Sequence, residues 1–106
     1  MSGKATRAKG RRGQTTAKHL LLDRDWNVAD LTAGVSTEDF IATDPSGRTW
    51  CVEVKNTRNL LDAHISQAKD QARRRGLPWL LMQKLTGSSC WLVRGTGLEP
   101  TVWSEK

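Results

Sequence analysis

The chain has 106 residues, 17 Lys and Arg against 11 Asp and Glu, a formal net charge of +6 and 37% hydrophobic residues. This length fits one domain, no apolar run reaches the ~20 residues that span a bilayer, and no apolar stretch follows the basic N-terminus as in a secretory leader. Cys51 and Cys90 lack the spacing of a disulfide framework or a metal site, and each lies in an apolar, strand-like run. We therefore expect two reduced, buried thiols.

The positive charge is concentrated at the N-terminus. Six Lys and Arg precede the first acid, Asp23, and residues 1–12 hold no large aliphatic or aromatic side chain beyond Met1. We expect residues 1–12 to form a flexible basic arm that a polyanion orders, with Lys9, Arg11 and Arg12 contacting the polyanion. Residues 13–106 are expected to form a single domain. A solubility tail and a cloning remnant are the alternatives for the arm.

The first half of the domain is predicted to contain one helix and three strands. Residues 13–24 have helical periodicity, and strands are predicted over 26–33 and 38–43. The residues 44–47 (Asp-Pro-Ser-Gly) form a strong turn signal. The alternating residues 48–56 then predict a third strand. Short turns between successive strands favour an antiparallel meander.

The second half is predicted to contain a helix over 59–75, which Gly76 ends, and strands over 79–83, 90–94 and 101–103. The intervening helix allows the fourth strand to pair in parallel with its neighbour. The helix is predicted to have an apolar stripe of Leu61, Ile65, Ala68 and Ala72 and a polar stripe of His64, Gln67 and Gln71. The predicted core tryptophans are Trp26, Trp50, Trp79 and Trp91, with Trp103 over the core or at a subunit interface.

A lysine and two acids are the candidate chemical groups. Glu53 and Lys55, two apart in a strand, share a face, and the predicted hairpin brings Asp39 of the preceding strand near them. Two carboxylates can hold a Mg²⁺ that polarises a phosphodiester and lowers the pKa of a bound water, with the Val54 carbonyl as a further ligand. The lysine can orient that water or stabilise charge on the phosphate. Opposite charges on a solvated strand face are the structural alternative.

Asp39 followed by Glu53-Val54-Lys55, in the order helix, three strands, helix, strand, resembles the PD-(D/E)XK nuclease superfamily. Among its branches, the chain is most similar to the small Holliday-junction resolvases and related phage endonucleases. The resemblance implies an α/β fold with an αβββαβ restriction-endonuclease-like core, a central mixed sheet flanked by helices. It also implies Asp39 and Glu53 as metal ligands and Lys55 as the catalytic lysine, with cleavage that leaves a 5′-phosphate and a 3′-hydroxyl.

Three further positions follow from the resemblance or from charge. Many members of the superfamily carry a glutamate early in the first helix, and the matching position here is Gln14, a departure that contributes no charge to a metal site. Related branches carry a glutamine on the helix after the Glu-x-Lys strand, for which Gln67 is the candidate and Gln71 the second. Arg58 is expected to join the arm in contacting DNA phosphates.

The expected function is therefore that of a Mg²⁺-dependent endodeoxyribonuclease, with Mn²⁺ as a substitute, that hydrolyses branched DNA as a Holliday-junction resolvase. Because a junction needs two incisions, we expect a homodimer. We expect a cytoplasmic location, in the host if a phage encodes the chain, and no membrane partner. A non-catalytic DNA-binding module on the same scaffold and an RNA-binding protein that uses the basic arm are the alternatives.

Overall fold

The computed structural model describes the backbone of residues 3–29, 39–59 and 61–105 and the side chains of 13–29, 40–59 and 61–105. Within these ranges the chain forms two helices and six strands. In chain order they are α1 (Gly3–Asp23), β1 (Asn27–Ala29), β2 (Asp39–Thr43), β3 (Thr49–Thr57), α2 (Ala63–Arg75), β4 (Trp79–Leu85), β5 (Cys90–Gly95) and β6 (Thr101–Ser104).

The six strands form one mixed sheet in the order β1-β2-β3-β4-β5-β6. Strands β3 and β4 pair in parallel, while all other neighbours in this sheet pair antiparallel. Helix α2 is the crossover that the parallel pair requires. The predicted α/β class, the three-stranded meander and the parallel fourth strand are therefore confirmed.

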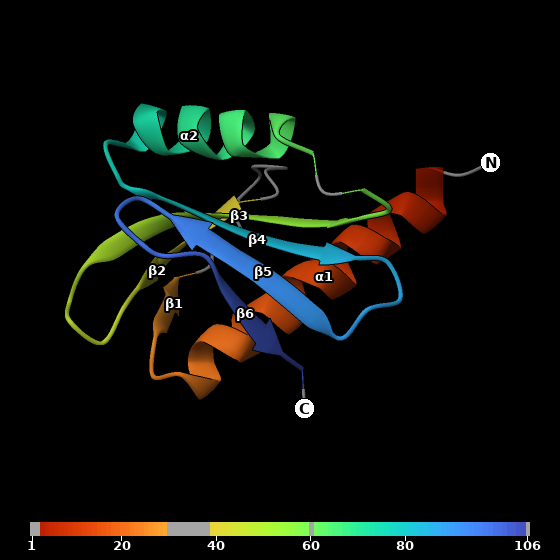
Figure 1. Cartoon of the computed structure of the whole chain (residues 1–106), viewed down its shortest axis with the longest axis horizontal. Coiled ribbons are helices and arrows are strands. Elements are labelled where there is room, and N and C mark those ends of the chain that lie inside the picture. Colours follow the sequence, from red (N-terminus) through yellow and green to blue (C-terminus); the bar gives the residue numbers. More distant parts are fainter. Residues whose placement is uncertain (1–2, 30–38, 60, 106) are drawn as a thin grey trace.

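The two helices cover opposite faces of the sheet (Figure 1). Apolar side chains of α1, such as Leu21, form the main core with Val52 and Val54 of β3 and with residues of β4 and β5. Because side chains alternate along a strand, Glu53 and Lys55 project to the other face, which α2 covers. The buried side chains of α2 are His64, Ala68 and Ala72.

Helix α1 begins at Gly3, ten residues before the predicted start at residue 13. The prediction placed a boundary where large apolar side chains begin, but Ala, Lys and Arg are themselves strong helix formers. The expected mobility of the arm and the contacts of Lys9, Arg11 and Arg12 concern side chains that lie outside the described residues. The remaining predicted elements agree within a few residues, with residues 30–38 outside the description.

The inward face of α2 differs from the predicted one. Helix α2 begins only at Ala63, so Leu61 precedes it and is 50% exposed, and Ile65 is half-buried. His64, which was assigned to the polar stripe, is 8% exposed and faces the sheet together with Ala68. Ala68 and Ala72 are buried as predicted, but the placement of Leu61 and His64 was wrong, because it ranked positions by hydrophobicity, whereas the sheet beneath α2 presents a polar partner for the histidine.

The tryptophans pack mainly on the α1 side. Trp50 and Trp91 are fully buried, and Trp26 and Trp103 partly cover them. The ring of Trp26 lies 6.3 Å from that of Trp50 and 6.4 Å from that of Trp103. Trp79 departs from the prediction, because it is only half-buried and lies under the Lys69 ammonium, 5.7 Å from its ring.

Cys51 is buried as predicted, but Cys90 is exposed. Cys90 begins β5, and its Cα partner is Ser104 of β6, the strand at the edge of the sheet. The predicted burial of Cys90 was therefore wrong. Neither helix in the described part of the chain has an apolar stretch of the length that a membrane crossing requires.

Candidate active site

The Glu53–Lys55 pair lies in the middle of the sheet, on the face covered by α2. The Lys55 ammonium is 3.6 Å from a Glu53 carboxylate oxygen, and the two side chains are only 15% and 6% exposed. A strand face in contact with solvent would leave such a pair open to water. Removing charges from water costs several kcal/mol per ion before the pair attraction offsets it, so this pair is poorly explained as a stabilising surface contact.

The backbone brings Asp39 to the same face. Asp39 and Glu53 are Cα partners in the antiparallel β2–β3 ladder. Directly opposite residues in such a ladder project from the same face with Cβ atoms about 5 Å apart. The predicted convergence of these two positions is thus present in the register, while the side chain of Asp39 lies outside the description.

A structured turn fixes that register. The Asp44 carboxylate accepts hydrogen bonds from the backbone N–H groups of Ser46 and Arg48, at 2.9 and 3.0 Å, and from the Ser46 hydroxyl. Its second oxygen accepts the Trp50 indole N–H at 3.0 Å. The Ser46 hydroxyl, followed by the Trp50 indole, lowers the pKa of Asp44 to about 2. A one-residue slip would turn Asp39 to the other face, so this turn holds the site together.

Two rows of side chains cross the α2 face. One row joins Glu53 to Leu81 of β4 and Arg94 of β5, and the next joins Lys55 to Gln83 and Leu92. The sequence-based site did not include Gln83 or Arg94. Each lies in a strand with an ordinary apolar pattern. Only the pairing of β4 with β3, and of β5 with β4, places these two residues beside Glu53 and Lys55.

Gln83 links these rows to α2. It is 1% exposed, its amide nitrogen lies 2.9 Å from Nδ1 of His64, and its amide oxygen accepts a hydrogen bond from Nη2 of Arg94. His64 thus has a buried side-chain partner in the sheet beneath α2. The motif signal that could have found Gln83 is a lone amide among apolar neighbours in residues 79–85.

The other predicted site residues are not brought to this pair. Gln14 lies on α1, which packs on the opposite face, where its neighbour Gly13 approaches Asn56. Gln67 is exposed and lies outside the buried stripe of α2, and Arg58 is exposed after β3. The Val54 side chain is in the α1-side core, and a role for its carbonyl remains a prediction.

Among the side chains that the structure describes, no three His, Cys, Asp or Glu residues gather as a metal site. The described donor set offers the Glu53 carboxylate, with Asp39 in register beside it. Two carboxylates suit Mg²⁺, which keeps several of its waters and needs few protein ligands. The register therefore allows the pair of carboxylates that the family resemblance implies for this ion.

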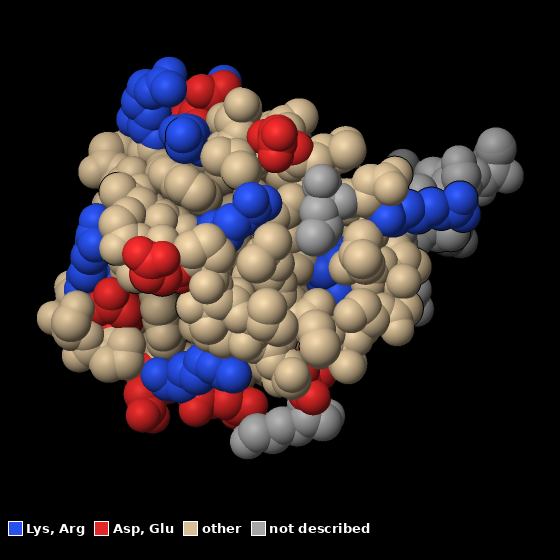
Figure 2. Space-filling view, in the orientation of Figure 1, with Lys and Arg blue, Asp and Glu red and all other residues tan. Residues whose placement is uncertain are grey.

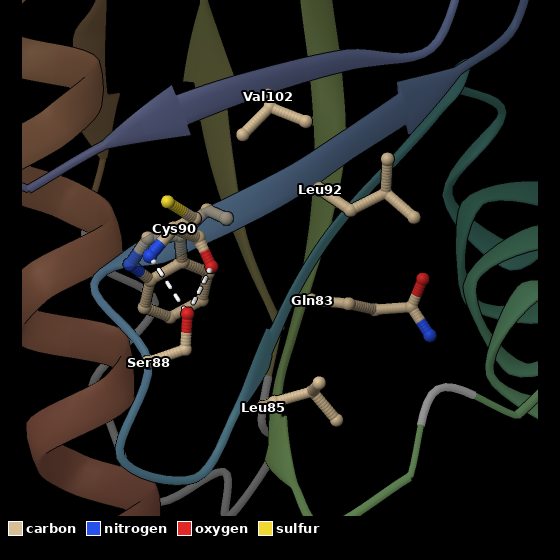
Figure 3. A pocket seen from close by; sticks show the side chains of 7 residues that line it. Gln83, Leu85, Ser88, Cys90, Leu92 and Val102 are labelled. Carbon is tan, nitrogen blue, oxygen red and sulfur yellow. Dashed lines mark hydrogen bonds between the residues drawn. The ribbon is translucent and has the colours of Figure 1, made fainter.

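A mostly apolar hollow of about 280 Å³ adjoins the Lys55–Gln83 row (Figure 3). The side chains that line it come from β4, β5 and β6 and the turn before β5: Gln83, Leu85, Ser88, Cys90, Trp91, Leu92 and Val102. Leu85 and Val102 are 42% and 61% exposed. The part of the α2 face that α2 does not cover is thus apolar and open.

Positive charge gathers at the C-terminal end of α2, where the last turn holds Arg73, Arg74 and Arg75 (Figure 2). Cations are favoured there by the helix dipole. Arg73 is 3.4 Å from the Asp70 carboxylate on the exposed surface. Lys, Arg, Asp and Glu side chains are also scattered over the rest of this view (Figure 2).

Comparisons of the chain with known protein families and with curated proteins find no match. The membership of the PD-(D/E)XK superfamily therefore remains a prediction from the motif and the element order.

Proposed function

We propose that the chain is a metal-dependent DNA endonuclease with a restriction-endonuclease-like αβββαβ core that acts on branched DNA as a Holliday-junction resolvase. The observation that carries this proposal is the Glu53–Lys55 pair, 3.6 Å apart and largely buried, with Asp39 as the Cα partner of Glu53. The element order α1-β1-β2-β3-α2-β4, with β3 and β4 parallel, supports the proposed core.

The acidic residues and the lysine would have different roles in cleavage. Glu53 and Asp39 would hold Mg²⁺, or Mn²⁺ in its place, which supplies polarisation of the phosphate and a bound water of lowered pKa. Lys55 would orient the attacking water or stabilise the charge that develops on the phosphate. Glu53 would also hold the Lys55 ammonium in position, since the two charged groups are 3.6 Å apart.

The proposal is tested with linear, flap and four-way-junction DNA incubated with the protein in Mg²⁺, in Mn²⁺ and in EDTA. We expect cleavage only with metal, strongest on the branched substrates, and lost in Lys55→Ala. Absence of metal-dependent cleavage of every substrate contradicts the proposal. Cleavage that persists in Lys55→Ala shows that the activity comes from another site.

A second candidate is a DNA-binding module without catalysis. It is favoured by the position of Gln14, which lies on the helix across the sheet and thus leaves Asp39 and Glu53 as the proposed acidic ligands. The same assay distinguishes it, because a binding module retards the junction in a gel and leaves it intact with metal.

We also propose that the active form is a homodimer, since one chain offers one Glu53–Lys55 pair and a four-way junction requires two incisions. Light scattering of the free protein and of its junction complex gives the stoichiometry. Two chains per junction are expected, and one chain per junction contradicts the dimer without bearing on cleavage itself.

A further inference from the structure

Arg94 is held in place by a buried amide. Its Nη2 donates a hydrogen bond to the Gln83 side-chain oxygen, and Gln83 is 1% exposed. A long surface arginine normally keeps its guanidinium in water and samples several rotamers. Here the head group instead lies against the sheet, which fixes its direction at the edge of the candidate site.

The hydrogen-bond chemistry of this contact fixes the state of His64 as well. Arginine can only donate, so the Gln83 oxygen must face Arg94 and the Gln83 NH₂ group must face His64. His64 Nδ1 is then an acceptor, which means that the imidazole is neutral with its proton on Nε2. Of the three hydrogen-bonded side chains, His64 is therefore a neutral ring, and only Arg94 carries positive charge.

Arg94 forms no ion pair among the side chains that the structure describes. Its buried Nε has no hydrogen-bond partner among those side chains. A guanidinium has five N–H donors. The guanidinium of this half-buried arginine keeps N–H donors beyond the one given to Gln83, and such a cation suits an anion with several oxygens, above all a phosphate.

Arg94 also lies in the row of the proposed metal ligands. Glu53 pairs with Leu81, and Leu81 pairs with Arg94, so the backbones of Glu53 and Arg94 are two strand spacings, roughly 10 Å, apart on one face. Lys55 and Gln83 occupy the next row. A nucleic-acid strand that brings one phosphate to Lys55 would pass beside Arg94.

We propose that Arg94 binds a backbone phosphate of the DNA at the Glu53–Lys55 site and that Gln83 and His64 position it. This inference rests on the proposed function for the kind of ligand. Arg94 is the residue in contact with substrate, whereas Gln83 and His64 act through Arg94.

The test measures binding of a labelled four-way junction in EDTA as a function of salt, so that cleavage plays no part. Each phosphate contact contributes about 0.7–0.9 to the slope of log K against log salt. Arg94→Gln is expected to flatten the slope by about that amount. The matched control is Arg24→Gln, which removes a half-buried arginine that is hydrogen-bonded to the Leu20 carbonyl on α1 and stacked on Trp103.

An unchanged slope in folded Arg94→Gln, or an equal change in Arg24→Gln, overturns the inference. Circular dichroism establishes folding, and Arg94→Met replaces Arg94→Gln under the same criterion if the glutamine variant does not fold. If the wild type binds the junction but never cleaves DNA, the proposed nuclease function fails while the slope still decides the role of Arg94. If the wild type does not bind DNA, both fail.

A double-mutant cycle tests the positioning role of Gln83. Gln83→Met, which keeps the volume and removes the acceptor, is expected to weaken junction binding in the wild type and to have little further effect in Arg94→Gln. Neighbours that act through one another show such non-additivity. Additive losses would mean that Gln83 only supports the fold, and would overturn its positioning role.

Discussion

The two faces of the sheet are formed by the same strands but carry different kinds of side chain. Toward α1, the strands present Trp50, Val52, Leu80 and other apolar side chains that form a continuous core. Toward α2, the intervening residues include Glu53 and Gln83, both nearly inaccessible to solvent. Apolar burial stabilises a fold directly, whereas buried polar groups are tolerated only when paired. The comparison shows that the pleat places the buried polar side chains on one face of these strands and the continuous apolar core on the other.

The largest expected effect is a loss of cleavage rate on removing a side chain from the α2 face. Lys55→Met removes the ammonium beside Glu53 and is expected to lower the rate of metal-dependent cleavage about 10²–10³-fold, as the loss of one group that stabilises a transition state does. Single-turnover cleavage of a four-way junction measures it.

Lys84→Met is the matched control for this change. Lys84 is the neighbouring β4 residue to Gln83, its side chain is also 15% exposed, and its ammonium lies 3.0 Å from the Glu105 carboxylate. Lys84 projects to the other face, with its ammonium 5.6 Å from the Trp91 ring, so the cleavage rate should stay within about twofold of wild type. A similar loss in both variants would contradict the division between the faces.

Two adjacent leucines compare the faces directly. Leu80 and Leu81 are both 0% exposed in β4, but Leu80 belongs to the α1-side core and Leu81 lies between Glu53 and Arg94. Either change to alanine is expected to lower the free energy of unfolding by about 2–5 kcal/mol in a urea titration. Only Leu81→Ala should also slow cleavage under conditions where the protein is folded, and an equal slowing in Leu80→Ala would refute this difference.

A smaller effect sharpens the account of the α1-side core. A Cβ at Gly95 would lie 2.8 Å from the Trp79 carbonyl oxygen and 3.1 Å from the Trp50 ring. Gly95→Ala is expected to lower the free energy of unfolding by about 1–3 kcal/mol, because backbone must move to relieve the overlap. Thermal and urea unfolding measure it. Stability equal to wild type would show that β5 is not closely packed there.

The smallest effect concerns the turn that sets the register. Because the pKa of Asp44 is lowered from 3.8 to about 2, mainly by the Ser46 hydroxyl and then by the Trp50 indole, its contribution to stability is present above about pH 4. That contribution is lost as the pH falls toward 2. Asp44→Asn should therefore lower the unfolding midpoint at pH 7 and match wild type near pH 2. A midpoint difference that does not depend on pH would contradict this cause.

Much of the fold could be predicted because it is encoded locally. The turn residues 44–47 and the alternation in 48–56 specify the β2–β3 hairpin, and with it the Asp39–Glu53 pairing. A lone amide among apolar neighbours marks Gln83 in the sequence, but its place beside the Glu53–Lys55 pair, like that of Arg94, could not be predicted, because it depends on the register of β3 and β4, which α2 separates in the chain. Ala68 and Ala72 were assigned correctly to the inward face of α2, while Leu61 and His64 were misassigned because Leu61 lies before the helix and His64 has a polar partner.

The parallel β3–β4 pair divides the chain into two halves, each made of neighbouring antiparallel strands. Glu53 and Lys55 belong to the first half, Gln83 and Arg94 belong to the second, and His64 lies on the helix between them. Each half can pair its own strands through short-range contacts. Bringing Glu53 and Lys55 beside Gln83 and Arg94, however, requires the long-range pairing of β3 with β4. Because Gln83 and Arg94 join Glu53 and Lys55 only through that pairing, the complete set of side chains forms when the two halves dock, and its formation reports this long-range contact rather than the formation of secondary structure.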